Sequence, residues 1–204
     1  MDSLVEQYYD NAIQNYNSGQ YEKAFDIFYD LAKKNIPEAQ MEIGYMLYEG
    51  KGCRKNIDES LVWFKKNEVR NNSEALRMMG WCYLKKNNIE DGIRYINKAL
   101  EMENIDAILD IGSFYDLGEY NFVVEKKKAL TYYTKGCSLG SRYGCKTMGL
   151  LLQEMNMSIA KHVEEHIGFI KFFKIVLQGN IIKIFINMIK ENCFFKTRNK
   201  SKGD

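Results

Sequence analysis

Apolar residues along most of the chain recur with the 3.6-residue period of amphipathic helices. Leu61 and Phe64 in one segment, and Ile93, Ile96 and Leu100 in another, fall on single helical faces. No alternation typical of strands extends over a useful length. Proline occurs once in 204 residues, which favours long uninterrupted helices. The pattern predicts an all-α fold.

A short motif recurs along the chain: an apolar residue, then a small one, then an apolar or aromatic residue three positions after the small one. The copies are Ile43-Gly44 with Leu47, Met79-Gly80 with Tyr83, Ile111-Gly112 with Tyr115, and Met148-Gly149 with Leu152, with a weaker copy at Ala12. Small residues at a fixed position indicate that two helices cross closely there. We therefore take Ala12, Gly44, Gly80, Gly112 and Gly149 as anchors of first helices.

A second motif, a small residue followed four positions later by a large one, marks the second helix of each pair. Its copies are Ala24 with Phe28, Ser60 with Phe64, Gly92 with Ile96, and Ala129 with Tyr133. From each of these small residues to the next first-helix anchor the distance is 20 residues in all four cases. Within a pair the distance varies between 12 and 17 residues, so insertions are expected in the loop inside a pair. A constant segment that stacks on its neighbour is typical of a solenoid.

Local signals agree with these helix boundaries. Pro37 followed by Glu38 fits the first turn of a helix, and Ser73 and Asp106 fit similar starts. The glycines of Gly50-Lys51-Gly52 fit a helix end.

The motifs resemble two related repeat families. The 12-residue spacings with Gly80, Tyr83 and Gly92 resemble the tetratricopeptide repeat (TPR), and the segments Ala39–Trp63 and Ala107–Tyr133 resemble the longer-looped Sel-one-like repeat (SLR). The resemblance covers roughly residues 5–154. It implies a right-handed α-α superhelix of antiparallel helix pairs over residues 1–154, and a non-enzymatic scaffold or adaptor that binds a protein partner.

In such arrays the first helix of each pair lines a concave groove that holds a peptide or helix of the partner. Counting from the anchors, the resemblance implies that this groove includes Tyr9, Ile13, Tyr16, Met41, Tyr45, Tyr48, Arg77, Trp81, Leu84 and Leu109. Tyrosine, tryptophan and arginine are enriched at binding hot spots. The alternative for each residue is packing against adjacent helices.

The segment Lys135–Cys145 resembles the cysteine-rich, secreted branch of the SLR family, in which two cysteines eight residues apart are bonded across a helix-turn-helix. That resemblance implies a disulfide between Cys137 and Cys145 and, as an alternative function, a secreted or periplasmic protein with β-lactam-binding or β-lactamase-like activity. The first residues, MDSLVEQYYDNA, lack the basic and apolar regions of a signal peptide, so a cytoplasmic protein with free thiols is the first expectation.

Patterns that could carry catalysis are incomplete. His162-Val163-Glu164-Glu165-His166 fits an inverted zinc-protease motif, but only Glu191 and Asp204 follow it as acidic ligands, and a solvated helical turn is the favoured interpretation. Cys53 and Cys82 lack the spacing of a zinc site. We expect no catalytic residue, no metal and no cofactor.

The charge distribution separates the array from the tail. Residues 1–160 carry 20 Lys and Arg against 23 Asp and Glu, whereas residues 161–204 carry nine against four. The array therefore lacks the basic stripe of a nucleic-acid-binding protein. After about residue 155 the repeat is lost, and the apolar, basic segment 155–204 has three interpretations: a cap on the array, helices that contact a membrane surface, or an aberrant reading frame.

Overall fold

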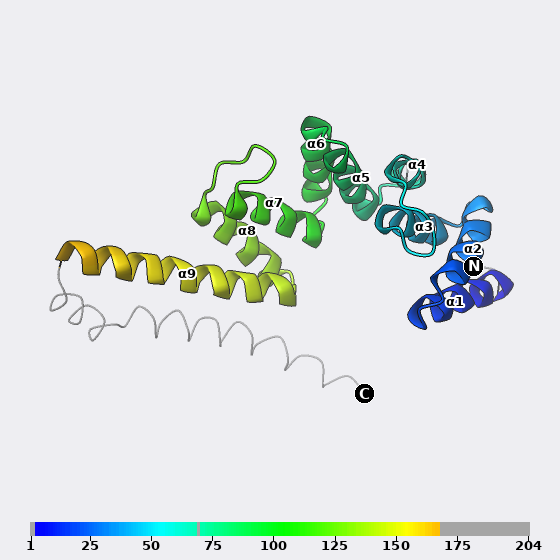
Figure 1. Cartoon of the computed structure of the whole chain (residues 1–204), viewed down its shortest axis with the longest axis horizontal. Helices are drawn as coiled ribbons and strands as arrows, with labels where there is room; N and C mark the ends of the chain where they lie inside the picture. The colour runs from blue at the N-terminus through cyan, green and yellow to red at the C-terminus, as the bar shows by residue number, and fades with distance from the viewer. Residues whose placement is uncertain (1–2, 69, 168–204) are drawn as a thin grey trace. The chain divides into compact units, whose positions relative to one another are not determined.

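The structure, a computed structural model, describes the backbone of residues 3–68 and 70–167 and the side chains of residues 4–68 and 70–156. Within these residues it contains nine α-helices and no strand (Figure 1). In chain order they are α1 (Ser3–Asn17), α2 (Tyr21–Lys33), α3 (Pro37–Glu49), α4 (Ile57–Glu68), α5 (Ser73–Lys85), α6 (Ile89–Glu101), α7 (Ile105–Leu117), α8 (Lys126–Ser138) and α9 (Arg142–Ile167). The predicted all-α class is confirmed.

Two kinds of connection join the helices. Six are three or four residues long, and each holds one residue in the left-handed conformation: Gly19, Asn35, Asn71, Asn87, Glu103 or Gly140. The other two, residues 50–56 and 118–125, lie inside the pairs α3/α4 and α7/α8. Both begin with a left-handed glycine that ends the preceding helix, Gly50 with φ 79° and Gly118 with φ 72°. Insertions inside the pairs are therefore confirmed.

Asparagine side chains begin several helices. Asn72 accepts hydrogen bonds from the backbone of Glu74 and Ala75, and Asn88 and Asn104 cap α6 and α7 in the same manner. Pro37 occupies the first turn of α3, as expected. These caps fix where α5, α6 and α7 start.

Consecutive helices pack against each other, and the two members of a pair are antiparallel. A Cβ placed at Gly80 would lie 2.5 Å from Ile96, and one placed at Gly92 would lie 2.5 Å from Leu84. A residue earlier in α5 thus meets a residue later in α6, which requires opposite directions. The same relation holds in α7/α8, where Gly112 meets Tyr133 and Gly136 meets Leu109.

Four of the five anchors, all except Gly149, lie in the core of the helix pairs, whereas a Cβ placed at Gly149 of α9 would meet no atom within 4 Å. A Cβ at Gly44 would lie 2.6 Å from the ring of Phe64, so only glycine lets α3 and α4 approach this closely. Ala12, Phe28, Phe64 and Ile96 are completely buried. Small anchors and large partners therefore interlock at Gly44, Gly80 and Gly112 in the manner that the two motifs predict.

The chain divides into two compact units, residues 1–151 and 152–204. The first holds α1–α8 and the beginning of α9. The boundary expected between residues 154 and 155 lies within α9, and the three roles expected for the tail concern side chains outside the described residues, so these stay predictions. Among the described residues no helix is both long and apolar enough to cross a bilayer.

Candidate protein-binding surface

The ten residues expected in the groove lie on the first helices of the pairs: α1, α3, α5 and α7. Seven of them keep part of their surface accessible: Tyr9, Ile13, Tyr16, Tyr45, Tyr48, Arg77 and Trp81. We call the surface formed by these seven residues the first-helix strip. Hydrogen bonds connect α1 to α3, α3 to α5 and α5 to α7 along it, so the strip is continuous from one pair to the next.

The other three expected groove residues are buried. Met41 is 9% exposed, and Leu84 and Leu109 are each 6% exposed. Leu84 fills the space above Gly92, and Leu109 contacts both Gly136 and Gly144. For these three residues the burial favours packing between helices, the alternative that the sequence left open.

Tyr45 of α3 and Trp81 of α5 each bond to a carboxylate of the next first helix. The Tyr45 hydroxyl donates to Glu74 at 2.7 Å, and the indole nitrogen of Trp81 donates to Asp110 at 2.8 Å. Arg77 connects the two carboxylates, because its guanidinium donates to Glu74 and to Asp110 at 3.0 Å. The network holds both rings in fixed orientations.

The α1 end of the strip is held in a similar way. The Tyr9 hydroxyl donates to Glu42 at 3.4 Å, and its ring meets Phe28 edge-on. Tyr16 accepts a hydrogen bond from the Lys51 ammonium at 3.0 Å. The aromatic side chains are therefore positioned before any partner binds.

Burial dominates the electrostatics of this network. It raises the pKa of Tyr9 to about 12, and it raises that of Tyr45 further above the ordinary value, with Glu74 adding to the shift. Burial also raises the pKa of Asp110, although the positive charge of Arg77 opposes the shift. The desolvation of Glu42 raises its pKa in the same direction. The two tyrosine hydroxyls thus act as hydrogen-bond donors at neutral pH.

Sequence reasoning missed two acceptors, Glu42 and Asp110. Both precede their glycine anchor, Gly44 or Gly112, by two residues. An alignment of the copies on the anchors, followed by a search for shared acidic positions, could have found them.

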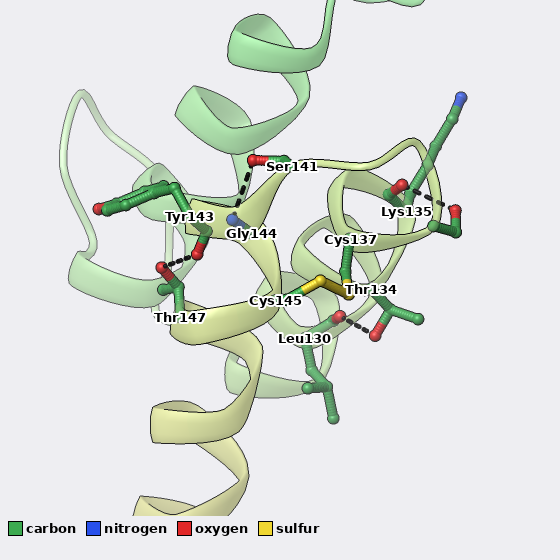
Figure 2. The surroundings of a disulfide bond; sticks show 10 residues. Leu130, Thr134, Lys135, Cys137, Ser141, Tyr143, Gly144, Cys145 and Thr147 are labelled. Carbon is green, nitrogen blue, oxygen red and sulfur yellow. Dashed lines mark hydrogen bonds between the residues drawn. A yellow bond between two sulfur atoms is a disulfide. The ribbon is translucent and has the colours of Figure 1, made fainter. Parts of the chain in front are cut away.

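The cysteine pair expected from the resemblance is bonded in the structure. Cys137 of α8 and Cys145 of α9 form a disulfide across the connection 139–141 (Figure 2). Ser141 caps the start of α9, because its hydroxyl accepts a hydrogen bond from the Gly144 backbone at 3.0 Å. A Cβ at Gly144 would lie 3.0 Å from the backbone nitrogen of Cys137, so the glycine allows the two helices to approach.

The sequence also offered free cysteines and a histidine motif as candidates for catalysis or metal binding. Cys82 is a buried thiol and Cys53 a half-buried one, and neither is in a disulfide. In residues 4–68 and 70–156, no three side chains of His, Cys, Asp or Glu gather in a group that could hold a metal. The side chains of His162 and His166 lie outside the described residues.

Comparison with known proteins agrees with this architecture. The Sel1 repeat family model matches residues 37–66, 73–104 and 105–141, which are the pairs α3/α4, α5/α6 and α7/α8. A Sel1 repeat protein from Oxalobacter formigenes is 27% identical in sequence and superposes with a TM-score of 0.55. The match covers 71% of this chain and 62% of that protein's chain.

Two further solved structures share the fold. A protective antigen of uropathogenic Escherichia coli with an SLR fold is 19% identical over 74% of this chain and 34% of its own, with a TM-score of 0.57. The MamA protein is 17% identical over 89% of this chain and 98% of its own, with a TM-score of 0.50. This chain thus spans less than two thirds of the first two structures. From its repeats, its helix pairs and these matches, the chain belongs to the Sel1-like repeat (SLR) family.

Proposed function

We propose that the protein is a non-enzymatic scaffold that binds a peptide or helix of a partner protein along the first-helix strip. Repeat arrays of this type typically serve as protein-interaction scaffolds, which supports a binding role in general terms. The choice of the strip as the binding surface is specific to this chain. It rests on one observation: Tyr45 and Trp81 are half-buried rings held by hydrogen bonds to Glu74 and Asp110.

Fixed aromatic rings are favourable anchors for a partner. A ring that is already ordered loses little conformational entropy on binding, so more of the contact energy appears as affinity. Trp81 also packs edge-on against Phe114 and Tyr120, with ring centroids 5.8 Å and 6.0 Å away. Aromatic residues in such settings are frequent hot spots.

The charge of the strip indicates the kind of partner. Glu38 and Asp106 are exposed in the first turns of α3 and α7, and Glu42 and Asp110 are partly accessible beside the rings. Arg77 is the strip's cation, and both carboxylates that flank it already bind it. A segment with Lys or Arg between apolar residues complements this surface.

The test is a double substitution of the two hydrogen-bonded rings, Tyr45 and Trp81. Partners are purified from the native cell on immobilised protein and identified by mass spectrometry, with wild type and Tyr45→Ala/Trp81→Ala in parallel. We expect the variant to lose the captured partner while its helical circular dichroism is unchanged. The control is Tyr143→Ala, because Tyr143 is 66% exposed in α9 and lies outside the strip.

Three outcomes would contradict the proposal. The double variant could keep the partner, the control could lose it equally, or the double variant could lose its helical signal. The third outcome would mean that both rings are core residues.

A second candidate function is favoured by the Cys137–Cys145 disulfide. Disulfides persist in oxidising compartments and are rare in the cytosol, so the bond supports a secreted or periplasmic protein of the cysteine-rich branch over the cytoplasmic expectation. Thiol titration of denatured protein from its native cell tests the compartment. The bond leaves three reactive thiols, whereas five contradict it. Turnover of the β-lactam nitrocefin tests the activity of that branch.

A further inference from the structure

An open pocket of about 560 Å³ lies between α2, α3, the loop 50–56 and the first turn of α4, which contributes Glu59. Phe25 and Tyr29 of α2 stack with an interplanar angle of 16° and form an aromatic floor, with Leu47 beside them. Arg54 and Lys55 of the loop form a cationic wall. A volume within the range of about 300–1,000 Å³ is typical of ligand sites.

The loop that carries the cations is fixed to the helices on both sides. The backbone of Gly50 donates to Met46 at 2.8 Å, and that of Asn56 donates to Leu47 at 2.9 Å. In the middle of the loop, Gly52 lies so close to the Tyr21 carbonyl that a Cβ would overlap its oxygen. The wall of the pocket is therefore formed in the free protein.

The charges in the pocket are not neutralised by one another. The Glu59 carboxylate accepts a hydrogen bond from Asn56 at 3.2 Å, while the Glu59 backbone donates to the Asn56 side chain, a reciprocal cap on α4. Lys55 lies 5.6 Å from the ring centroid of Tyr48. Arg54 is exposed and has no carboxylate partner among the described residues. The pocket lining carries the two positive charges of Arg54 and Lys55 against the one negative charge of Glu59, so it keeps a net positive charge above the aromatic floor.

We infer that this pocket is a second binding site, which takes an acidic peptide segment of a partner protein with an aromatic side chain next to a carboxylate. The ring stacks on Phe25 and Tyr29, and the carboxylate binds the Arg54 guanidinium, which can make two parallel hydrogen bonds to it. Lys55 adds a second positive charge. The site does not depend on the first-helix strip, which complements a segment of the opposite charge.

Fluorescence polarisation with a labelled hexapeptide, Glu-Phe-Glu-Glu-Phe-Glu, tests the inference on the full chain. We expect saturable binding that weakens with salt, and at least tenfold weaker binding by Arg54→Glu/Lys55→Glu. Replacing each Glu of the peptide by Gln should weaken binding by a similar factor. Circular dichroism and thermal unfolding verify that the variant is folded.

Two further variants locate the site. Arg142→Glu/Lys146→Glu makes the same change of charge on exposed residues of α9, and Tyr45→Ala/Trp81→Ala removes the rings of the strip. Both should bind the acidic peptide as the wild type does. The inference is overturned if the wild type does not bind, if the Gln peptide binds equally well, or if either variant loses binding as much as Arg54→Glu/Lys55→Glu does.

Discussion

The two helix pairs with long connections, α3/α4 and α7/α8, share a backbone arrangement but present different side chains. In both loops the first glycine donates to the preceding helix, and the last residue donates to the residue three positions after the anchor, Leu47 or Tyr115. Between these bonds the first loop presents Arg54 and Lys55, and the second presents Val123 and Val124, which are 74% and 52% exposed. Backbone hydrogen bonds thus fix both ends of each loop, and the exposed side chains between those ends differ.

The two pairs also differ in how they are joined to the next first helix. The first pair uses a polar side chain, because Tyr45 of α3 donates to Glu74 of α5. In the second pair Ser113 occupies the position of Tyr45, and the covalent bond between Cys137 and Cys145 joins α8 to α9. A solenoid depends on its nearest-neighbour contacts, so different chemistry can serve the same junction.

The largest expected loss of stability comes from a substitution in the first loop, residues 50–56. Gly52→Ala should lower the free energy of unfolding by about 3 kcal/mol, because the residue has a φ of +68° and its Cβ would displace the backbone of Tyr21. Gly118→Ala should cost only about 1 kcal/mol, since the neighbour there is the movable side chain of Val124. Urea unfolding of both variants measures the difference. Equal losses would show that the loops are equally constrained.

The second-largest expected loss of stability follows removal of the disulfide between Cys137 and Cys145. Cys137→Ser/Cys145→Ser should lower the stability by about 2 kcal/mol, because the bond closes a short loop that restricts the unfolded chain. The effect should also appear when wild-type protein is unfolded with a reducing agent present. Cys53→Ser is the control, since that thiol is in no disulfide. An unchanged urea midpoint for the double variant would contradict the role of the bond.

The helix pairs were predictable from the sequence because close helix crossings need small residues at fixed positions. Gly44, Gly80 and Gly112 each meet a large residue of the paired helix, and that constraint leaves a periodic trace. The residues that cap the helix N-termini were harder to predict from the sequence. Ser73 and Asp106 were expected near the starts of α5 and α7, but the caps themselves are Asn72 and Asn104.

The candidate surface was predictable only in part. Counting from the anchors placed Tyr45 and Trp81 on the strip, but the same count included Leu84, which is buried, because helical position does not reveal how deep a side chain lies. The acceptors Glu42 and Asp110 were missed since hydrogen bonds between repeats depend on distances in space. The pocket at Arg54 is lined by residues of α2, α3, α4 and a loop, and no sequence motif links these segments.

The polar junction of the first pair gives the third prediction. Tyr45→Phe should lower the stability by about 1 kcal/mol at pH 7, because it removes the hydrogen bond to Glu74 and keeps the ring. Tyr143→Phe, at an exposed position, should leave the stability unchanged at this pH.

The same variant has a consequence at alkaline pH. Burial raises the pKa of Tyr45 in the folded state above its unfolded value of about 10. Its contribution to stability is therefore complete below pH 10 and is lost as the pH rises toward the folded pKa. We expect the decline in the free energy of unfolding above pH 10 to be shallower in Tyr45→Phe than in the wild type. Parallel declines would show that the hydroxyl is not buried as the structure has it.

The smallest expected effect on stability comes from making the second loop resemble the first. Val123→Arg/Val124→Lys should change the free energy of unfolding by less than about 0.5 kcal/mol, because both side chains are largely exposed. The substitutions should also fail to create a second site for the acidic hexapeptide.

When α2 and α6 are aligned on their small residues, Ala24 and Gly92, Phe25 and Tyr29 of α2 correspond to Ile93 and Asn97 of α6. The second loop therefore lacks a stacked aromatic floor. To measure binding at the second loop alone, the acidic hexapeptide is titrated against a variant that also carries Arg54→Val/Lys55→Val, which removes the two positive charges that line the pocket at the first loop. Binding restored by the new charges would mean that charge alone recruits the peptide and that the aromatic floor contributes nothing.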